Sequence, residues 1–382
     1  MNGIRIGRVF GIDVAIHPSW FLIFGLFTFT LATGFFPRAY GSWSSTEAWI
    51  VAAVATILLF VSVLAHELGH SLVARAQGIP VTNITLFLLG GVSTLEKEAT
   101  SPGREALMAG VGPLVSLVIG LVSWAAASLL PAPQPVQAVL LYLGLANVTL
   151  AVFNLLPGFP LDGGRVLRAL LWWRLRDRVR ATRGAATVGQ VVGYLFIVLG
   201  VLQILGGSPF GGLWLGFVGW IIVQGSRAGA AHEVMQRDLA GATASRLMTE
   251  PAGWLRPFVT LDSAAQHGFR DFDSRCLAVE PEEEDQVFDG LMCARDLDVE
   301  PRLQWATRRV RDAMVPARDI PIVAPDAPAL EVLRLMQKSR ADRVAVIEEG
   351  RLLGFVDATS VDRYLRWHET RRQPPESRLT AA

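Results

Sequence analysis

Long apolar runs separated by short polar segments dominate the first 228 residues. A helix needs about 20 apolar residues to cross the hydrocarbon core of a bilayer. The runs that reach or approach this length, the last of them short, are 19–36, 47–74, 106–130, 136–156, 187–205 and 211–224. The pattern predicts a polytopic α-helical membrane protein with about six transmembrane helices over residues 1–228.

Two shorter segments have a strand-like pattern. Residues 1–16 alternate apolar and polar side chains in places, which predicts a small strand pair at the membrane surface. Residues 81–89 are rich in β-formers, end at Gly90-Gly91 and are too short to span a bilayer. We interpret this second segment as a hairpin or re-entrant edge strand against which an extended substrate could pair. The alternative is a simple surface loop.

The chain changes character after residue 224. Charge rises sharply from a linker at 229–242 onward, and similar segments then recur at an offset of roughly 65 residues. This recurrence predicts a cytosolic α/β domain at 243–366 made of two repeats, 243–305 and 306–366, and a disordered tail at 367–382. The elements expected in the second repeat are helix 329–339, strand 343–347, a turn at 349–350, strand 353–356 and a final helix.

The composition agrees with a membrane domain joined to a soluble one. Hydrophobic residues make up 51% of the chain and charged residues 18%, below the roughly 25% of a typical soluble domain. The formal net charge of +1 argues neither for nor against nucleic acid, and we expect no direct nucleic-acid binding. The two cysteines, Cys276 and Cys293, offer neither a disulfide framework nor a thiolate zinc site, which suits a reducing cytosol.

Charges between the apolar runs determine the expected orientation, because cytoplasmic loops are enriched in Lys and Arg. Arg5 and Arg8 precede the first run, and the most basic segment, 165–183, follows the fourth. The segments after the third and fifth runs, 131–135 and 206–210, carry no charge. We therefore predict that both termini are cytoplasmic and that the second run crosses from outside to inside.

The second apolar run contains the sequence His66-Glu67-Leu68-Gly69-His70. Residues i and i+4 of a helix share a face, so both imidazoles can bind one zinc ion while the adjacent glutamate activates a water. Ionisable residues at membrane depth are costly and indicate a functional site by default. The predicted orientation places this motif toward the cytoplasmic end of the run.

A catalytic zinc ion usually has three protein ligands and one open position. We predict Asp162 as the third ligand, because it lies in segment 154–164, which follows the fourth run on the same membrane side. Prolines and glycines there prevent a regular helix. Irregular backbone is tolerated at membrane depth only where protein or a water cavity covers it. As alternatives, Asp162 caps a following helix and Asn154 merely ends one. In the functional interpretation Asn154 donates a hydrogen bond near the zinc.

Together the two motifs resemble those of the site-2 proteases, the intramembrane zinc metalloproteases. The His-Glu-x-x-His motif is present at 66–70, and the family's Asn-x-x-Pro-x-Pro-x-x-Asp-Gly-like segment appears as a close variant at 154–163. The resemblance covers roughly residues 1–228. It implies that one Zn²⁺ per chain is bound by His66, His70 and Asp162 and that Glu67 is the catalytic general base.

The duplicated C-terminal domain resembles a pair of CBS domains, which are sensor modules for adenosyl ligands. The family's Gly-x-x-Thr-x-x-Asp segment has a cysteine for the threonine at 290–296, and the segment at 354–360 keeps neither the threonine nor the aspartate. The resemblance implies that Asp296 contacts an adenine nucleotide and that the domains form a homodimer. The alternative is a domain that only packs or docks a partner.

These expectations combine into one functional hypothesis. The chain is a multi-pass intramembrane zinc endopeptidase of a prokaryotic plasma (inner) membrane, which cleaves a membrane-tethered protein near the cytoplasmic face and is modulated by the CBS pair. The resemblance implies a single-pass substrate, such as an anti-sigma or pro-sigma factor, within the lipid bilayer. The alternatives are a CBS-regulated zinc transporter and a catalytically silent scaffold, although the intact Glu67 beside both histidines disfavours the scaffold.

Overall fold

The chain forms two compact units, Met1–Glu233 and Val234–Ala382. The computed structural model describes residues 3–87, 90–95, 99–251, 253–269, 276–283, 286–339 and 342–372. The boundary between the units falls inside helix α8 (Pro209–Leu239), so most of the predicted linker at 229–242 is helical. A helix there agrees with the residues present, because alanine, glutamate, methionine and glutamine are good helix formers, and the bounds of the linker stay a prediction.

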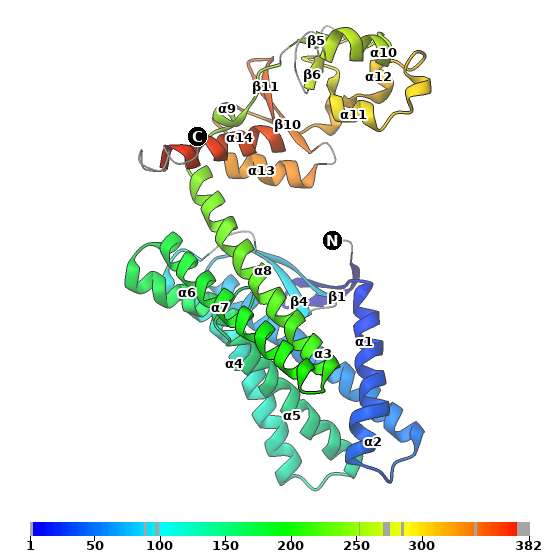
Figure 1. The fold of residues 1–382 in the computed structure, drawn as a ribbon, viewed down its shortest axis with the longest axis vertical. Coiled ribbons are helices and arrows are strands. Elements are labelled where there is room, and N and C mark those ends of the chain that lie inside the picture. Colours follow the sequence, from blue (N-terminus) through cyan, green and yellow to red (C-terminus); the bar gives the residue numbers. More distant parts are fainter. Residues whose placement is uncertain are drawn as a thin grey trace. The chain divides into compact units, whose positions relative to one another are not determined.

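Long helices dominate the first unit (Figure 1). Five stretches of the described residues are long and apolar enough to cross a membrane, and they confirm the first five predicted spans. The sixth predicted span, 211–224, lies in α8, which is not among those five. The helices are α1 (Ser19–Thr30), which continues through a π-helical turn (Leu31–Phe35) into α2 (Phe36–Ala39), then α3 (Ser45–Ala76), α4 (Pro102–Leu129), α5 (Gln134–Asn154), α6 (Asp162–Leu175) and α7 (Arg178–Leu205).

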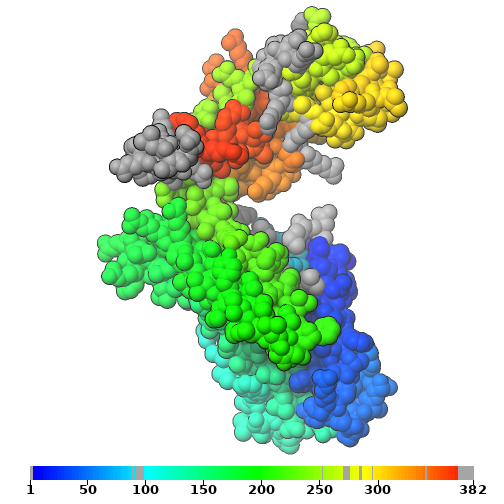
Figure 2. Space-filling model, viewed as in Figure 1, coloured from blue at the N-terminus to red at the C-terminus, as the bar shows by residue number. Residues whose placement is uncertain are grey.

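Small residues allow these helices to approach one another closely. Ala52 and Ala55 of α3 are fully buried, and they belong to one apolar cluster with Ala138 of α5 and Phe36 of α2. Small side chains at helix interfaces are typical of packing in lipid, where close van der Waals contact replaces the hydrophobic effect. Helices α7 and α8 (green) lie side by side on the face shown in Figure 2, and a hydrogen bond of 2.8 Å from Arg227 to the Tyr194 hydroxyl connects them.

A four-stranded sheet with the order β1-β2-β3-β4 accompanies the helices of the first unit. Strands β1 (Ile4–Val9) and β2 (Ile12–Ile16) form the predicted N-terminal pair, and β3 (Val81–Phe87) forms the predicted hairpin with β4 (Gly90–Leu95). Residues 88–89 of the hairpin segment lie outside the described residues. Strand β4 ends the strand order, so among the described strands it pairs with β3 alone.

The second unit contains two small sheets with the same sequence of pairings. In one, β5 (Trp254–Leu255) is parallel to β6 (Cys276–Val279), which is antiparallel to β7 (Gly290–Cys293) and joined further to β8 (Val315–Pro316). In the other, β9 (Ile322–Val323), β10 (Arg343–Glu348) and β11 (Arg351–Asp357) repeat the parallel and antiparallel pairings. The helices and single turns between them are α9 (Ala244–Leu247), α10 (Leu261–Ser263), a π-helical turn (Ala264–Phe269), α11 (Ala294–Asp298), α12 (Val310–Ala313), α13 (Ala329–Lys338) and α14 (Ala358–Arg372).

This arrangement agrees with the elements predicted for the second repeat. Helix α13, strands β10 and β11 and helix α14 occupy the predicted positions in the predicted order. Helix α14 continues to Arg372, inside the segment predicted as a disordered tail, while residues 373–382 lie outside the described residues.

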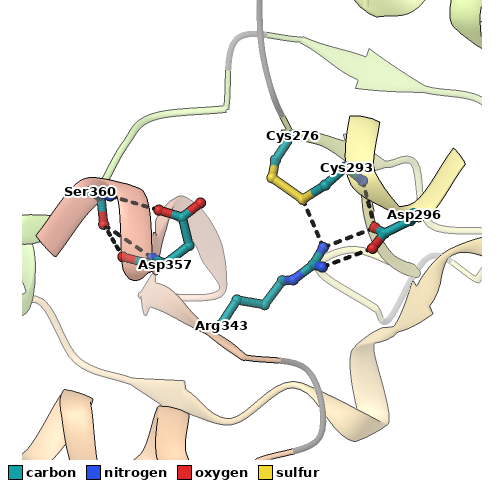
Figure 3. Close-up of a disulfide and its surroundings, with 6 residues drawn as sticks. All are labelled: Cys276, Cys293, Asp296, Arg343, Asp357 and Ser360. Atoms are coloured by element: carbon teal, nitrogen blue, oxygen red, sulfur yellow. Dashed lines mark hydrogen bonds and ion pairs between the residues drawn. A yellow bond between two sulfur atoms is a disulfide. The ribbon is translucent and has the colours of Figure 1, made fainter. Parts of the chain in front are cut away.

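The two cysteines form a disulfide, contrary to the sequence-based expectation (Figure 3). Cys276 of β6 and Cys293 of β7 are directly opposite each other in the antiparallel pair, with Cα atoms 3.9 Å apart. The side chain of Arg343 lies against this bond, with Nη1 2.8 Å from the Cys293 sulfur. The pairing depends on strand register, which a separation of 17 residues in the sequence does not reveal.

Candidate metal centre

Helix α3 places both histidines of the motif on one buried face. His66 and His70 are only 4% and 8% exposed, and their ring centroids lie 4.8 Å apart. This proximity follows from the spacing of four residues, which is close to one helical turn. Glu67 is half-buried on the same turn of the helix. The expected geometry of the motif is therefore present.

The first residue of α6 completes the cluster. The chain between α5 and α6 is irregular, and its turns are closed by backbone hydrogen bonds from Gly158 to Leu156 and from Leu161 to Gly158. Asp162 follows at once, and its Oδ2 atom lies 3.2 Å from Nε2 of His66 and 3.2 Å from Nε2 of His70. The N-cap of α6 is Leu161, so Asp162 is not the cap of this helix.

Helix α4 holds the far side of both imidazole rings. Nδ1 of His70 donates a hydrogen bond of 2.6 Å to the carbonyl oxygen of Met108, and Nδ1 of His66 is 2.9 Å from the Ser116 hydroxyl. Partners of this kind orient metal-binding imidazoles and fix their tautomer. Sequence reasoning missed both contacts, although a serine within an apolar span is a signal that could have indicated Ser116.

The donor atoms fit a zinc ion. Because a carbonyl only accepts, Nδ1 of His70 carries a proton, so in the neutral ring Nε2 presents its lone pair to the Asp162 carboxylate. Two acceptors at this distance repel unless a proton or a metal ion lies between them. The two Nε2 atoms are 3.1 Å apart, so all three donor atoms are separated by 3.1–3.2 Å. Tetrahedral zinc ligands with bonds near 2.05 Å are about 3.3 Å apart, which is close to this spacing.

Two glycines keep the space around these groups free of side chains. A Cβ atom on Gly112 of α4 would lie 2.1 Å from Nε2 of His70 and 2.6 Å from Nε2 of His66. A Cβ atom on Gly91 of β4 would lie 2.4 Å from Cγ of Glu67. The backbone of α4 therefore borders the metal-binding atoms, and the backbone of β4 borders the predicted general base.

A buried ion-pair network lies further along α6. Arg168 donates to the carboxylate of Glu105 on α4 through two of its nitrogens and approaches Glu233 of α8, with Nη1 and Oε2 3.5 Å apart. Arg178, at the start of α7, also pairs with Glu233 at 3.2 Å. Glu105 is 1% exposed. The network joins four helices around the element that carries Asp162, and sequence reasoning did not predict it.

The two remaining predicted residues lie elsewhere. Asn154 is the last residue of α5, and its role stays a prediction. Asp296 belongs to the second unit, where Arg343 of β10 binds both of its carboxylate oxygens, with N–O distances of 3.0 and 3.1 Å (Figure 3). The role of Asp296 as a nucleotide ligand also stays a prediction.

Comparisons with known proteins agree with this site. The family model described as peptidase family M50 matches residues 54–135 and 131–200, which include the two histidines, Glu67 and Asp162, and the CBS domain model matches residues 310–366. The Synechocystis protein sll0528 is 34% identical over 374 residues, covering 96% of both chains. Rip3 of Mycobacterium tuberculosis is 34% identical over 369 residues, covering 95% of this chain and 93% of its own.

Two archaeal proteins are also similar to this chain. The zinc metalloprotease MJ0392 of Methanocaldococcus jannaschii is 28% identical over 363 residues, covering 94% of each chain. The solved structure of a site-2 protease from Methanocaldococcus jannaschii is 30% identical, covers 60% of this chain and 95% of its own, and superposes with a TM-score of 0.43. Since the match to the Synechocystis relative spans nearly the whole of both chains and the M50 match contains the cluster of His66, His70 and Asp162, this chain belongs to peptidase family M50, the site-2 proteases, and is a zinc metalloprotease with a C-terminal CBS domain.

Proposed function

We propose that this protein is an intramembrane endopeptidase that cleaves a membrane-tethered protein near the cytoplasmic face, with His66, His70 and Asp162 as zinc ligands and Glu67 as the general base. The observation that carries the proposal is the cluster of three donor atoms on the apolar helix α3 and at the start of α6. The substrate class is a single-pass membrane protein, such as an anti-sigma or pro-sigma factor.

The chemistry follows from the residues present. Zinc at this position would lower the pKa of a bound water and polarise the carbonyl of the scissile bond. Glu67 would accept a proton from the attacking water and deliver it to the nitrogen of the leaving amine. Ser116 and the Met108 carbonyl hold the imidazoles in place during these steps. Asn154 is proposed to donate a hydrogen bond that orients the substrate.

The edge of β4 supplies a binding mode for an extended peptide. A helical substrate has its carbonyls occupied by hydrogen bonds and must unwind locally before cleavage. Strand β4 has an edge that no described strand covers, and its Gly91 touches Glu67. A substrate strand added along β4 would use main-chain hydrogen bonds and pass close to the general base.

Substitution of the general base tests the proposal. Glu67→Gln should abolish cleavage while zinc content and fold remain, because glutamine keeps the shape but cannot accept the proton. Glu47→Gln on the same helix is the matched control. Glu47 forms a capping box with Ser44, a role that glutamine also fills, so this variant should remain active. Comparative membrane proteomics of cells with each variant would identify substrates that accumulate only with Glu67→Gln.

The outcomes separate the proposed protease from its alternatives. Undiminished proteolysis by Glu67→Gln would refute the mechanism. Zinc flux in proteoliposomes that is retained in Glu67→Gln, without accumulation of any membrane protein, would favour a CBS-regulated zinc transporter. Unchanged proteomes with either variant and no zinc flux would favour the catalytically silent scaffold.

We further propose that both termini are cytoplasmic in a prokaryotic plasma (inner) membrane. The basic segment 165–183 and Arg5 and Arg8 lie on the side of the membrane where α4 and α7 begin, as the positive-inside rule requires for cytoplasmic loops. Reporter fusions at residue 382 and in the loop at 131–133 test the orientation. Cytoplasmic activity of the loop fusion would contradict it.

For the second unit we propose regulation through a CBS pair at 243–366 that binds an adenine nucleotide and dimerises. The repeated order of strand pairings supports the duplication. Any nucleotide that uses Asp296 must compete with Arg343, which holds both carboxylate oxygens. Calorimetric titration of the full chain with ATP and AMP tests this. Binding that is unchanged in Asp296→Asn would remove Asp296 from the site.

A further inference from the structure

A pocket lies where two of the membrane helices begin. Its volume is about 700 Å³, and it is lined by Pro102, Trp172, Trp173, Arg174 and Arg176. This volume is within the range of about 300–1,000 Å³ that is typical of ligand sites. Pro102 is the first residue of α4, Trp172 to Arg174 lie in the last turn of α6, and Arg176 lies between α6 and α7. None of these residues takes part in the metal centre.

The positions of the spans place this pocket at the level of the lipid headgroups. The apolar helices α4 and α7 begin at Pro102 and Arg178 and run away from the pocket. Helix α5 returns the chain between them, so both helices begin on the same side of the membrane. A pocket at the start of two spans lies at the boundary between hydrocarbon and water, where tryptophan is enriched.

The charge of the pocket favours an anion. Within residues 165–183 there are seven arginines and one aspartate. In the described part of the chain, neither Arg174 nor Arg176 has a carboxylate within ion-pair distance, while the neighbouring Arg180 pairs with Asp177. The aligned peptide dipoles of α4 add partial positive charge at its N-terminus, where Ser101 makes no side-chain capping bond and the acidic residue of the first turn, Glu105, is paired with Arg168.

The apolar surroundings distinguish a lipid from a free anion. Trp173 is 73% exposed and Leu170 and Leu175 are 56% and 46% exposed beside the arginines. Trp172 is held in place beneath Arg178, whose guanidinium carbon is 5.4 Å from a ring centroid. A free phosphate would use only the cations, whereas a phospholipid would also cover these apolar side chains with its acyl chains.

We propose that this pocket, formed by Pro102, Trp172, Trp173, Arg174 and Arg176, binds the phosphate headgroup of an anionic phospholipid. The headgroup phosphate is bound by Arg174 and Arg176, and the acyl chains lie against the exposed tryptophan and leucines. The site is independent of the proteolytic chemistry and anchors the start of α7 and the end of α6 at the membrane surface.

Lipid binding to the purified full-length protein tests the proposal. Native mass spectrometry in detergent would count bound phosphatidylglycerol and phosphatidylcholine for the wild type, for Arg174→Gln/Arg176→Gln and for Arg180→Gln/Arg183→Gln. The last variant is the matched control, since it removes the same charge from exposed residues of the same segment outside the pocket. Circular dichroism of each variant checks that the fold is retained.

The wild type should retain phosphatidylglycerol over phosphatidylcholine. The pocket variant should bind phosphatidylglycerol about 25-fold more weakly, since each arginine that contacts the bound headgroup contributes about five-fold. The control variant should stay within about two-fold of the wild type, because its arginines lie outside the pocket. Equal retention of both lipids, or equal losses in the two variants, would overturn the proposal. Displacement of phosphatidylglycerol by millimolar inorganic phosphate would show a free-anion site and would also overturn it.

Discussion

The hydroxyl of Ser116 lies 2.9 Å from Nδ1 of His66, on the side of the ring opposite the Asp162 carboxylate. Ser116 is fully buried in α4, 50 residues away from His66 in the sequence. The contact makes α4 part of the metal centre even though this helix contributes no predicted ligand. His66 is thereby held between a serine behind the ring and an acidic partner in front of it.

Removing this hydroxyl should weaken zinc binding. Ser116→Ala is expected to raise the Kd for zinc about 10- to 100-fold, the usual effect of losing a partner that orients a metal ligand. Competition with a chromophoric chelator measures the Kd. Ser123→Ala, also buried on α4, is the matched control and should leave the Kd unchanged. Ser116→Thr should restore most of the affinity, and an unaltered Kd in Ser116→Ala would show that the contact is dispensable.

The space in front of the histidines should not tolerate even a methyl group. Gly112→Ala places a Cβ atom 2.1 Å from Nε2 of His70, which is closer than two non-bonded heavy atoms can approach. We expect the purified variant to contain clearly less than one zinc ion per chain, as measured by elemental analysis. Gly110→Ala is the control on the same helix, because a Cβ atom there meets nothing within 4 Å. Full zinc occupancy in Gly112→Ala would contradict the geometry of the site.

The membrane spans could be predicted from the sequence because the bilayer imposes length and hydropathy on every crossing. The cluster of His66, His70 and Asp162 could be predicted because the two histidines are local on one helix and Asp162 lies in a segment whose prolines exclude regular helix. A serine in an apolar span marks Ser116 as unusual, but its contact with His66 could not be predicted, and neither could that of Gly91 with Glu67, because both depend on how α4 and β4 pack against α3. Tertiary packing of this kind leaves no periodic signal in the chain.

The buried network around Arg168 should be important for stability. Arg168→Met leaves the carboxylates of Glu105 and Glu233 without this partner in a buried environment, and we expect a loss of about 3–5 kcal/mol. Unfolding of the detergent-solubilised protein in sodium dodecyl sulfate measures the change. Arg180→Met, at a surface pair 78% and 40% exposed, should change stability by less than about 1 kcal/mol. Equal effects of both substitutions would argue against a structural role for the network.

The disulfide between Cys276 and Cys293 should stabilise the second unit. It closes a loop between residues 17 apart, for which the chain-entropy model gives about 3 kcal/mol. Reduction by dithiothreitol removes this stabilisation and so raises the population of the open form. Because proteolysis of a folded domain tracks that population, the reductant should accelerate cleavage of this unit roughly a hundred-fold. Limited proteolysis with and without reductant measures the ratio. In Cys276→Ser/Cys293→Ser the rate should be high and independent of reductant, so any acceleration there would reflect another effect of the reagent. Alkylation of both thiols in the native, unreduced protein would show that the bond is not formed.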